Sequence, residues 1–217
     1  MKNIDVIRDL EQEFQLASED AIRIRILDAT LEMLVNFGVR RTTIEDVAKR
    51  NKMGRPTIYR RFPDKNALIK AAIEWECQRS FLSIWKHLRT IEDPEEQLLQ
   101  CFVAITHAAA KHPLLTRLLA TEPEAVLPFL TIEAGGVIEL ARAQFTPYLL
   151  EMQKQGYFPD IDADYSVELL TRLFMSLLLT KTTKIDPLDF AQLDKFARTY
   201  LSRLFINSTR RAARTEK

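Results

Sequence analysis

Basic side chains gather in one short stretch of the chain, over residues 40–65. The stretch holds nine Lys or Arg and three Asp or Glu, a formal charge of +6, whereas the rest of the chain carries −5. Clustered positive charge suits phosphate groups, because Lys and Arg neutralise them and release bound counterions. The stretch therefore predicts a local electrostatic function, and the alternative is a solvated charged face on an ordinary helical hairpin.

Two short helices are expected in this stretch, with a three-residue turn between them. Either Thr42 or Thr43 can cap the first helix, over about 44–50, since each has an acidic residue three positions later. Residues 51–53 form the turn, and the second helix covers about 55–61. A pair of helices joined this closely is typical of helix-turn-helix proteins, whose second helix enters the major groove of DNA.

The second helix carries residue types that suit DNA. Arg holds a guanine edge with two hydrogen bonds, the methyl group of Thr contacts thymine, and Tyr binds phosphate. Ile58 and Phe62, four residues apart, are expected to face the helical core beside Val47 and Met53. The residues of these suitable types are Arg55, Thr57, Tyr59, Arg60 and Arg61.

The elements that must position these side chains are all expected to be helices. Only 5 of 217 residues are Gly, and no long run alternates with period two. The N-terminus lacks the apolar run of a signal peptide, and no apolar stretch reaches about 20 residues, so a cytoplasmic protein without a membrane span is expected. The first expected helix is capped by Ser18 and ends at Gly38, and the two short helices described above follow it. Asp64 is expected to cap the next helix, over about 65–89. The remaining helices are expected over about 95–110, 113–120, 124–130, 133–155, 163–181 and 187–206.

A longer run of sequence carries a resemblance. The segment TTIEDVAKRNKMGRPTIYRRFPDKNALI resembles the DNA-binding signature of the tetracycline-repressor (TetR) family of transcriptional regulators. The preceding RIRILDATLEMLVNFGVR is similar to that family's first helix and Gly-terminated corner, so the match covers about residues 20–75. The positions that fall at the family's spacing are Thr43, Ala48, Thr57, Tyr59, Phe62, Lys65 and Leu68.

The resemblance implies an all-α architecture and a set of DNA contacts. An N-terminal three-helix helix-turn-helix DNA-binding domain is joined through a long fourth helix to a C-terminal helical domain that binds a ligand and dimerises. Thr42 and Thr43 are expected near a phosphate, and Tyr59 and Lys65 are expected to hold phosphates. Arg61 departs from the family pattern, since it stands where an aromatic residue is common, and is a candidate for a further phosphate contact. The residues expected to face bases are Arg55, Pro56, Thr57 and Arg60.

The sequence departs from the family pattern in the turn. Lys52 stands where Gly is usual, so a left-handed backbone there would be strained. Gly54 replaces the frequent Ser cap, and Asn51 stands where a small Ala is common. These departures keep an alternative open, a helical ligand- or partner-binding protein without specific DNA binding.

The resemblance divides the chain into four parts and gives the C-terminal helices two tasks. The last two long helices carry apolar stripes, such as Phe174 and Tyr200, that are expected to pair with a second copy, the alternative being core within one chain. Candidates for lining an effector cavity are Thr106, His107, Tyr148 and Phe174, each of which is alternatively an ordinary core or surface residue. The parts are an N-terminal extension (1–17), the helix-turn-helix domain (18–64), the ligand-binding and dimerisation domain (65–208) and a basic tail (209–217).

Enzymatic chemistry has little support in the sequence. His107 and His112 are five residues apart, which does not stack two ligands on one helix face, and no HExxH, P-loop, GxSxG or GxGxxG motif occurs. Glu122 and Glu124 flank a proline and indicate a loop and a helix start rather than paired catalytic acids. The prediction is a non-enzymatic homodimeric repressor, without metal or cofactor, that binds a palindromic operator and is released by a small-molecule effector; an all-α enzyme is the remaining alternative.

Overall fold

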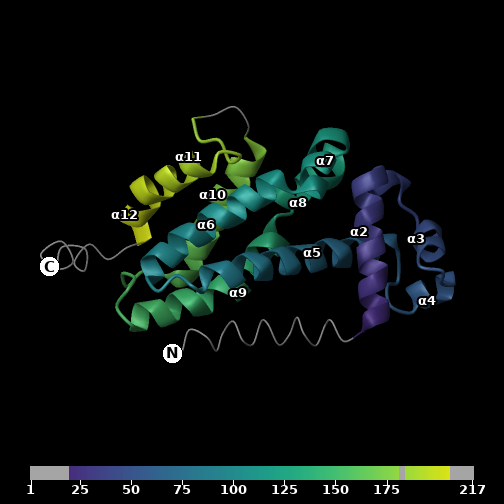
Figure 1. The fold of residues 1–217 in the computed structure, drawn as a ribbon, viewed down its shortest axis with the longest axis horizontal. Coiled ribbons are helices and arrows are strands. Elements are labelled where there is room, and N and C mark those ends of the chain that lie inside the picture. The colour runs from purple at the N-terminus through teal and green to yellow at the C-terminus, as the bar shows by residue number, and fades with distance from the viewer. Residues whose placement is uncertain (1–19, 181–183, 206–217) are drawn as a thin grey trace, which may run out of the picture. The chain divides into compact units, whose positions relative to one another are not determined.

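The structure is a computed structural model that describes residues 20–180 and 184–205 of the chain (Figure 1). Within these ranges every regular element is a helix, which confirms the predicted all-α class. The expected extension 1–17 and tail 209–217 lie outside the described residues. The helices are α2 (Ala21–Arg41), α3 (Ile44–Arg50), α4 (Arg55–Tyr59), α5 (Lys65–Leu88), α6 (Pro94–Lys111), α7 (Pro113–Thr121), α8 (Pro123–Leu130), α9 (Gly135–Lys154), α10 (Ala163–Leu179), α11 (Phe190–Phe196), the π-helical turn η1 (Ala197–Leu201) and α12 (Ser202–Phe205).

Two compact units make up the described chain. We call residues 20–83 with His112–Leu127 the head unit, and Ile84–Lys111 with the described residues from Pro128 onward the body unit. The head unit thus contains α7 and the start of α8, although both lie in the part of the sequence expected to form the ligand-binding and dimerisation domain (65–208). The domain boundary expected at residue 64 remains a prediction, and it falls within the head unit.

The start and the end of α2 depend on two residues. The carboxylate of Asp20 accepts the backbone N–H groups of Ile22 (3.1 Å) and Arg23 (2.9 Å) and so caps the helix. The expected cap, Ser18, lies outside the described residues. At Gly38 the backbone turns to φ 81° and ψ 178°, a conformation that essentially only glycine adopts, and the helix then resumes as far as Arg41.

Local caps also fix the short helices that follow. The hydroxyl of Thr43 accepts the N–H of Asp46 (3.1 Å), so Thr43 rather than Thr42 is the N-cap of α3. The carboxylate of Asp64 accepts the N–H of Ala67 (2.8 Å) at the start of α5, as the sequence predicts. These caps explain why the expected helix starts in this region are accurate to within a residue or two.

A single apolar core holds the head unit together. It includes Ile26 and Leu34 of α2, Val47 of α3 and Ile58 of α4, all fully buried. Phe62 and Met53 pack against the same cluster, which confirms the predicted inward face of the helix-turn-helix. Burial of apolar surface stabilises the fold by about 25 cal/mol per Å². This stabilisation holds helices as short as α3 and α4 in place, since they are too short to be stable alone.

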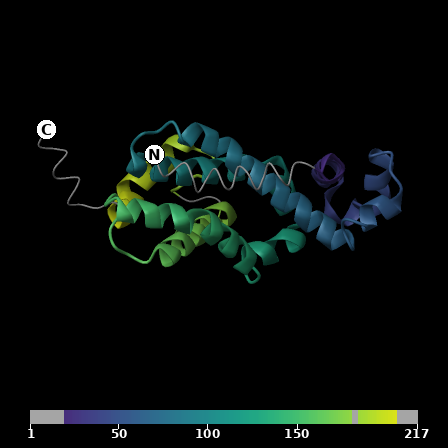
Figure 2. The same cartoon turned by 90° about the horizontal axis from the view of Figure 1, so that it is seen from below.

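The body unit is a layered helical bundle. Helices α9 and α10, both green in Figure 2, run side by side, and α11 packs on α6. One buried polar pair lies inside: the hydroxyl of Tyr148 donates to Oε1 of Gln97 (2.6 Å), whose amide donates to the carbonyl of Leu88 (3.0 Å). No helix among the described residues is long and apolar enough to cross a membrane.

The last helical segment differs from the continuous helix expected over 187–206. Helix α11 begins at Phe190, and a π-helical turn interrupts the segment at Ala197–Leu201. Arg198, on this turn, donates to both carboxylate oxygens of Glu96 (2.7 and 2.5 Å) and to Asp194 (2.8 Å). The bidentate pair therefore ties the π-helical turn to α6.

Candidate nucleic-acid interface

Helix α4 presents one polar surface and is fixed from behind by apolar residues. Ile58 is fully buried in the head core, and Phe62 follows it one turn later. The opposite side of the helix is solvent-exposed, apart from the half-buried Thr57. The exposed residues on that side are Arg55, Pro56, Tyr59 and Arg60.

Two of these side chains are available for an external partner. Among the described residues, neither the side chain of Tyr59 nor that of Arg60 has a hydrogen-bonding or ionic partner. Arg55 lies 3.9 Å from a carboxylate oxygen of Glu45, which also pairs with Lys49 at 3.1 Å. These pairs are exposed and weak, so a phosphate or a base edge can replace them at little cost.

The turn between α3 and α4 has the strained backbone that its sequence predicts. Lys52 adopts φ 54°, and among the described residues it is the only one other than glycine with positive φ. Its neighbours hold the turn: the side-chain amide of Asn51 donates to the carbonyl of Val47 (3.0 Å), and Arg25 donates to the carbonyl of Asn51 (3.1 Å). The turn is thus closed by Asn51 and Arg25 despite the missing glycine.

The structure separates the two threonines that were expected to lie near a phosphate. Thr43 is exposed, and its hydroxyl both caps α3 and donates to the carboxylate of Asp46 (2.5 Å). Thr42 is only 1% exposed, and its hydroxyl donates to the carbonyl of Gly38 (2.7 Å). In this conformation Thr42 stabilises the corner that precedes α3, and Thr43 alone of the two reaches the surface.

Lys65 lies beside the same corner. Its ammonium group donates to the carbonyl of Arg40 (3.3 Å), and it occupies the first position of α5. The free N–H groups of a helix start favour an anion. Thr43, Arg40 and Lys65 are therefore the basic and polar groups that the fold brings to the corner.

Arg61 has a partner inside the protein. Its guanidinium donates to the carboxylate of Asp20 (3.1 and 3.4 Å), and its side chain is 19% exposed. The hydrogen bond from Arg61, together with that from the backbone of Arg23, lowers the pKa of Asp20. Arg61 therefore joins the end of the recognition segment to the cap of α2, and its expected phosphate contact remains a prediction.

The four residues expected to bind an effector lie in the body unit and have internal contacts. The hydroxyl of Thr106, buried, donates to the carbonyl of Phe102 (2.7 Å). His107 lies 3.0 Å from the carbonyl of Pro187, Tyr148 belongs to the buried pair described above, and Phe174 packs against the cluster around Ile138. Nothing in these contacts tests an effector role, which remains a prediction.

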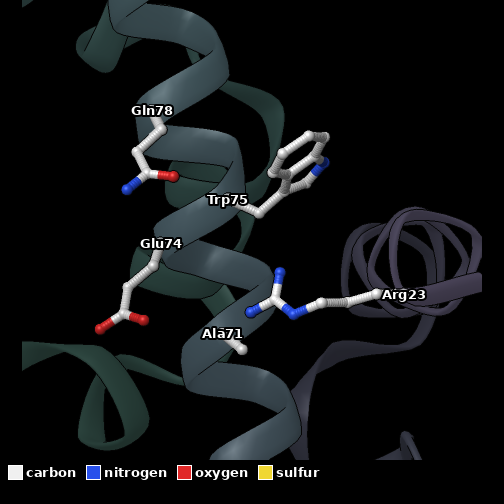
Figure 3. Close-up of a pocket in the computed structure, with 5 residues that line it drawn as sticks. All are labelled: Arg23, Ala71, Glu74, Trp75 and Gln78. Atoms are coloured by element: carbon white, nitrogen blue, oxygen red, sulfur yellow. The ribbon is translucent and has the colours of Figure 1, made fainter. Parts of the chain in front are cut away.

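A cavity of about 210 Å³ opens in the head unit (Figure 3). Glu74, Trp75 and Gln78 lie along α5, and Arg23 extends toward them from α2. The indole N–H of Trp75 donates to Asp28 (3.2 Å). No group of three or more His, Cys, Asp or Glu side chains suitable for a metal occurs among the described residues.

Comparison with known proteins agrees with this arrangement. Residues 26–72 match the family model "Bacterial regulatory proteins, tetR family". An uncharacterised HTH-type transcriptional regulator of Mycobacterium bovis is 26% identical over 98 residues, which are 45% of this chain and 50% of that protein. The match thus spans about half the length of that curated relative.

Solved structures show the same fold over most of the chain. A TetR-family transcriptional regulator from Pectobacterium atrosepticum superposes with a TM-score of 0.64 at 17% identity, covering 88% of this chain and 97% of that one. The TetR family repressor AlkX from a Dietzia strain gives 0.60 at 22% identity, covering 82% and 94%. Residues 26–72 therefore match the DNA-binding domain of the tetR family of bacterial regulatory proteins, and most of the chain has the fold of solved TetR-family regulators.

Proposed function

We propose that the protein is a DNA-binding transcriptional regulator, and that α4 is its recognition helix. The observation that carries the proposal is the two-sided character of α4: Ile58 anchors it, while Tyr59 and Arg60 are exposed and without a partner among the described residues. In the major groove Arg60 would hydrogen-bond base edges, and Tyr59 would hold a phosphate. The matching relative, named an HTH-type transcriptional regulator, supports this function.

A homodimer is part of the proposal, because a palindromic operator has two equivalent half-sites about 34–36 Å apart. The body unit has exposed apolar side chains on the two helices that the sequence assigns to a dimer. Tyr165 and Leu169 are exposed on α10, and Tyr200 and Leu204 are 59% and 56% exposed on the last segment. A second copy of the chain would remove these side chains from water.

The effector and its action also belong to the proposal. A small molecule that binds one arrangement of the body better than another would change the spacing of the two recognition helices and so release DNA. The protein would then act as a repressor in the cytoplasm, without enzymatic activity. The candidates for contact with the effector remain Thr106, His107, Tyr148 and Phe174.

Selection of genomic fragments with the purified protein at about 0.15 M salt tests the proposal, since nonspecific binding is weak at that ionic strength. A palindrome shared by the recovered fragments, and bound well above scrambled duplexes, is the expected result. Weak binding to all fragments that disappears with added salt would contradict specific regulation. That result would favour the alternative of a helical partner-binding protein.

A further inference from the structure

Breaking α2 at Gly38 leaves backbone groups that need partners. Residues 39–41 form a last helical turn after the break, and the N–H groups at the start of such a turn have no acceptor within the helix. The carbonyl of Gly38 is satisfied by Thr42, whose N–H and hydroxyl both donate to it (3.3 and 2.7 Å). The N–H of Arg40 needs an acceptor from elsewhere in the chain.

Glu122 supplies that acceptor from a position 82 residues away. Its Oε2 accepts the N–H of Arg40 at 2.9 Å, and the residue is only 8% exposed. Its own backbone is fixed, because its N–H donates to the carbonyl of Leu118 and its carbonyl accepts the N–H of Ala125 (both 2.9 Å). A buried carboxylate is costly unless it is hydrogen-bonded in this way, so its position is well defined.

The space at the corner is shared between glycine and this carboxylate. A Cβ atom built on Gly38 would overlap Oε1 of Glu122. Gly38 is therefore required by its backbone conformation, and any other residue there would also displace the carboxylate of Glu122 from the N–H of Arg40. The corner and the α7–α8 turn fit each other as one unit within the head.

The groups that follow the corner are those of the candidate interface. Thr43 caps α3 directly after it, and Lys65 donates to the carbonyl of Arg40 (3.3 Å). A second acid, Glu124 in the first turn of α8, pairs with the guanidinium of Arg40 (2.6 Å), and both of these side chains are more than half exposed. Glu122 holds the backbone of the corner, whereas Glu124 holds one surface side chain.

We infer that Glu122 is a positioning residue for DNA binding: by capping the N–H of Arg40, it orients the corner so that Arg40, Thr43 and Lys65 contact phosphates. This inference rests on the proposed function. The expected change in DNA affinity is opposite in direction to the purely electrostatic one. Removing a negative charge near DNA strengthens binding if only electrostatics matter, whereas loss of a positioning residue weakens it.

The test measures binding of the full-length protein to a random-sequence 30-bp duplex at about 0.05 M salt, and repeats the measurement across a salt series. Glu122→Ala is expected to bind about tenfold more weakly and to lose about one phosphate contact, a fall of about 0.9 in the salt slope. Glu122→Gln, which keeps an oxygen in place, should bind within about twofold of wild type. The matched control Glu124→Ala should bind as tightly as wild type or more tightly.

The outcomes separate the inference from the proposed function. If wild type does not bind the duplex even at low salt, the proposed function fails. If wild type binds and folded Glu122→Ala keeps its affinity and salt slope, the inference is overturned, and a lower melting temperature alone would leave Glu122 only a structural role. If Glu122→Ala does not fold, Glu122→Met fills the same space without an acceptor. The affinity and the salt slope of that variant then test the inference in the same way.

Discussion

Lys52 is the residue at which the helix-turn-helix departs most from an ordinary backbone. Its φ of 54° lies in the left-handed region, where a side chain costs about 1–2 kcal/mol and glycine costs nothing. The N–H of Lys52 still donates to the carbonyl of Lys49 (3.0 Å), so the turn is formed despite the strain. A cationic side chain on this exposed turn adds positive charge to the candidate interface.

Lys52→Gly is therefore expected to raise the free energy of unfolding by about 1 kcal/mol, because it relieves the left-handed strain. Urea denaturation followed by circular dichroism measures the change. The matched control is Lys70→Gly in the exposed interior of α5, which should lower the same quantity by about 1 kcal/mol. A destabilised Lys52→Gly would show that the turn is not strained as described.

Replacing Arg60 should weaken DNA binding, whereas replacing the adjacent Arg61 should lower thermal stability. Arg60 is exposed without a partner among the described residues, so Arg60→Ala should leave stability within about 0.5 kcal/mol of wild type. It should lower affinity for the selected operator about tenfold and relax base preference, because one good base contact contributes about 1–3 kcal/mol. Competition binding against a panel of single-base variants of the operator measures this.

Arg61→Ala should instead lower the melting temperature, since Arg61 pairs with Asp20 at the cap of α2. The pair lowers the pKa of Asp20, so its contribution is present above the unfolded value of about 3.9 and is lost as pH falls through the folded value. The difference in melting temperature between Arg61→Ala and wild type should therefore shrink in acid. An equal loss of base preference in both variants would contradict the distinction.

The π-helical turn is the element that sets the outer face of the last segment. Leu193, Ala197 and Leu201 are buried on one side, while Tyr200 and Leu204 are exposed on the other. Arg198 fixes the turn through its ion pairs, and these raise its pKa above the ordinary value. The outward pair of apolar side chains is what the proposed dimer would cover.

Tyr200→Glu combined with Leu204→Glu should convert the proposed dimer to monomer, weakening association about 100-fold or more, because a buried interface cannot accommodate two unpaired carboxylates. Sedimentation velocity over a range of protein concentrations measures the change. Thr199→Glu, exposed on the same turn, is the control and should leave the sedimentation coefficient unchanged. A wild-type protein that is already monomeric would contradict the dimer.

Prolines and capping residues explain why many helix starts could be predicted from the sequence. Pro94, Pro113 and Pro123 each occupy the first position of a helix, and Asp64 caps α5. The π-helical turn could not be predicted, because no Gly or Pro falls within it and the residue with which Arg198 pairs, Glu96 of α6, is about a hundred positions earlier in the sequence. Local pattern thus determines where helices start, but not how they bend against a neighbour.

The candidate site likewise combines features that the local sequence predicts with contacts that it does not predict. The exposed and buried sides of α4 follow from the spacing of Ile58 and Phe62. The burial of Thr42, the pairing of Arg61 with Asp20 and the contact of Glu122 with Arg40 depend on residues far apart in sequence. A single sequence carries no local signal for such contacts.

At the scale of the whole molecule, the head unit is larger than the segment that resembles a DNA-binding signature. Leu114 and Leu118 of α7 belong to the same buried cluster as the residues of α2 and α4. These two residues lie more than a hundred positions into the chain, and they complete a core that also includes Ile26 near its start. The stability of the helix-turn-helix should depend on this later segment.

Leu118→Ala tests that dependence. Leu118 is 2% exposed, so its truncation should lower the free energy of unfolding by about 3 kcal/mol through lost burial and a cavity. Leu127→Ala, in the same unit but 38% exposed, should cost clearly less. Thermal unfolding followed by calorimetry measures both, and equal small losses would show that α7 is not part of the head core.

Specific DNA binding through α4 can be tested with a single binding comparison. Fluorescence anisotropy at about 0.15 M salt compares wild type and Arg60→Ala on the selected palindrome and on a scrambled duplex of the same composition. We expect wild type to prefer the palindrome by at least about 1,000-fold. Arg60→Ala should reduce this preference about tenfold, through the loss of one base contact, while it still binds both duplexes. Equal affinity of wild type for the two duplexes, or an Arg60→Ala variant that discriminates as well as wild type, would contradict specific DNA binding through α4.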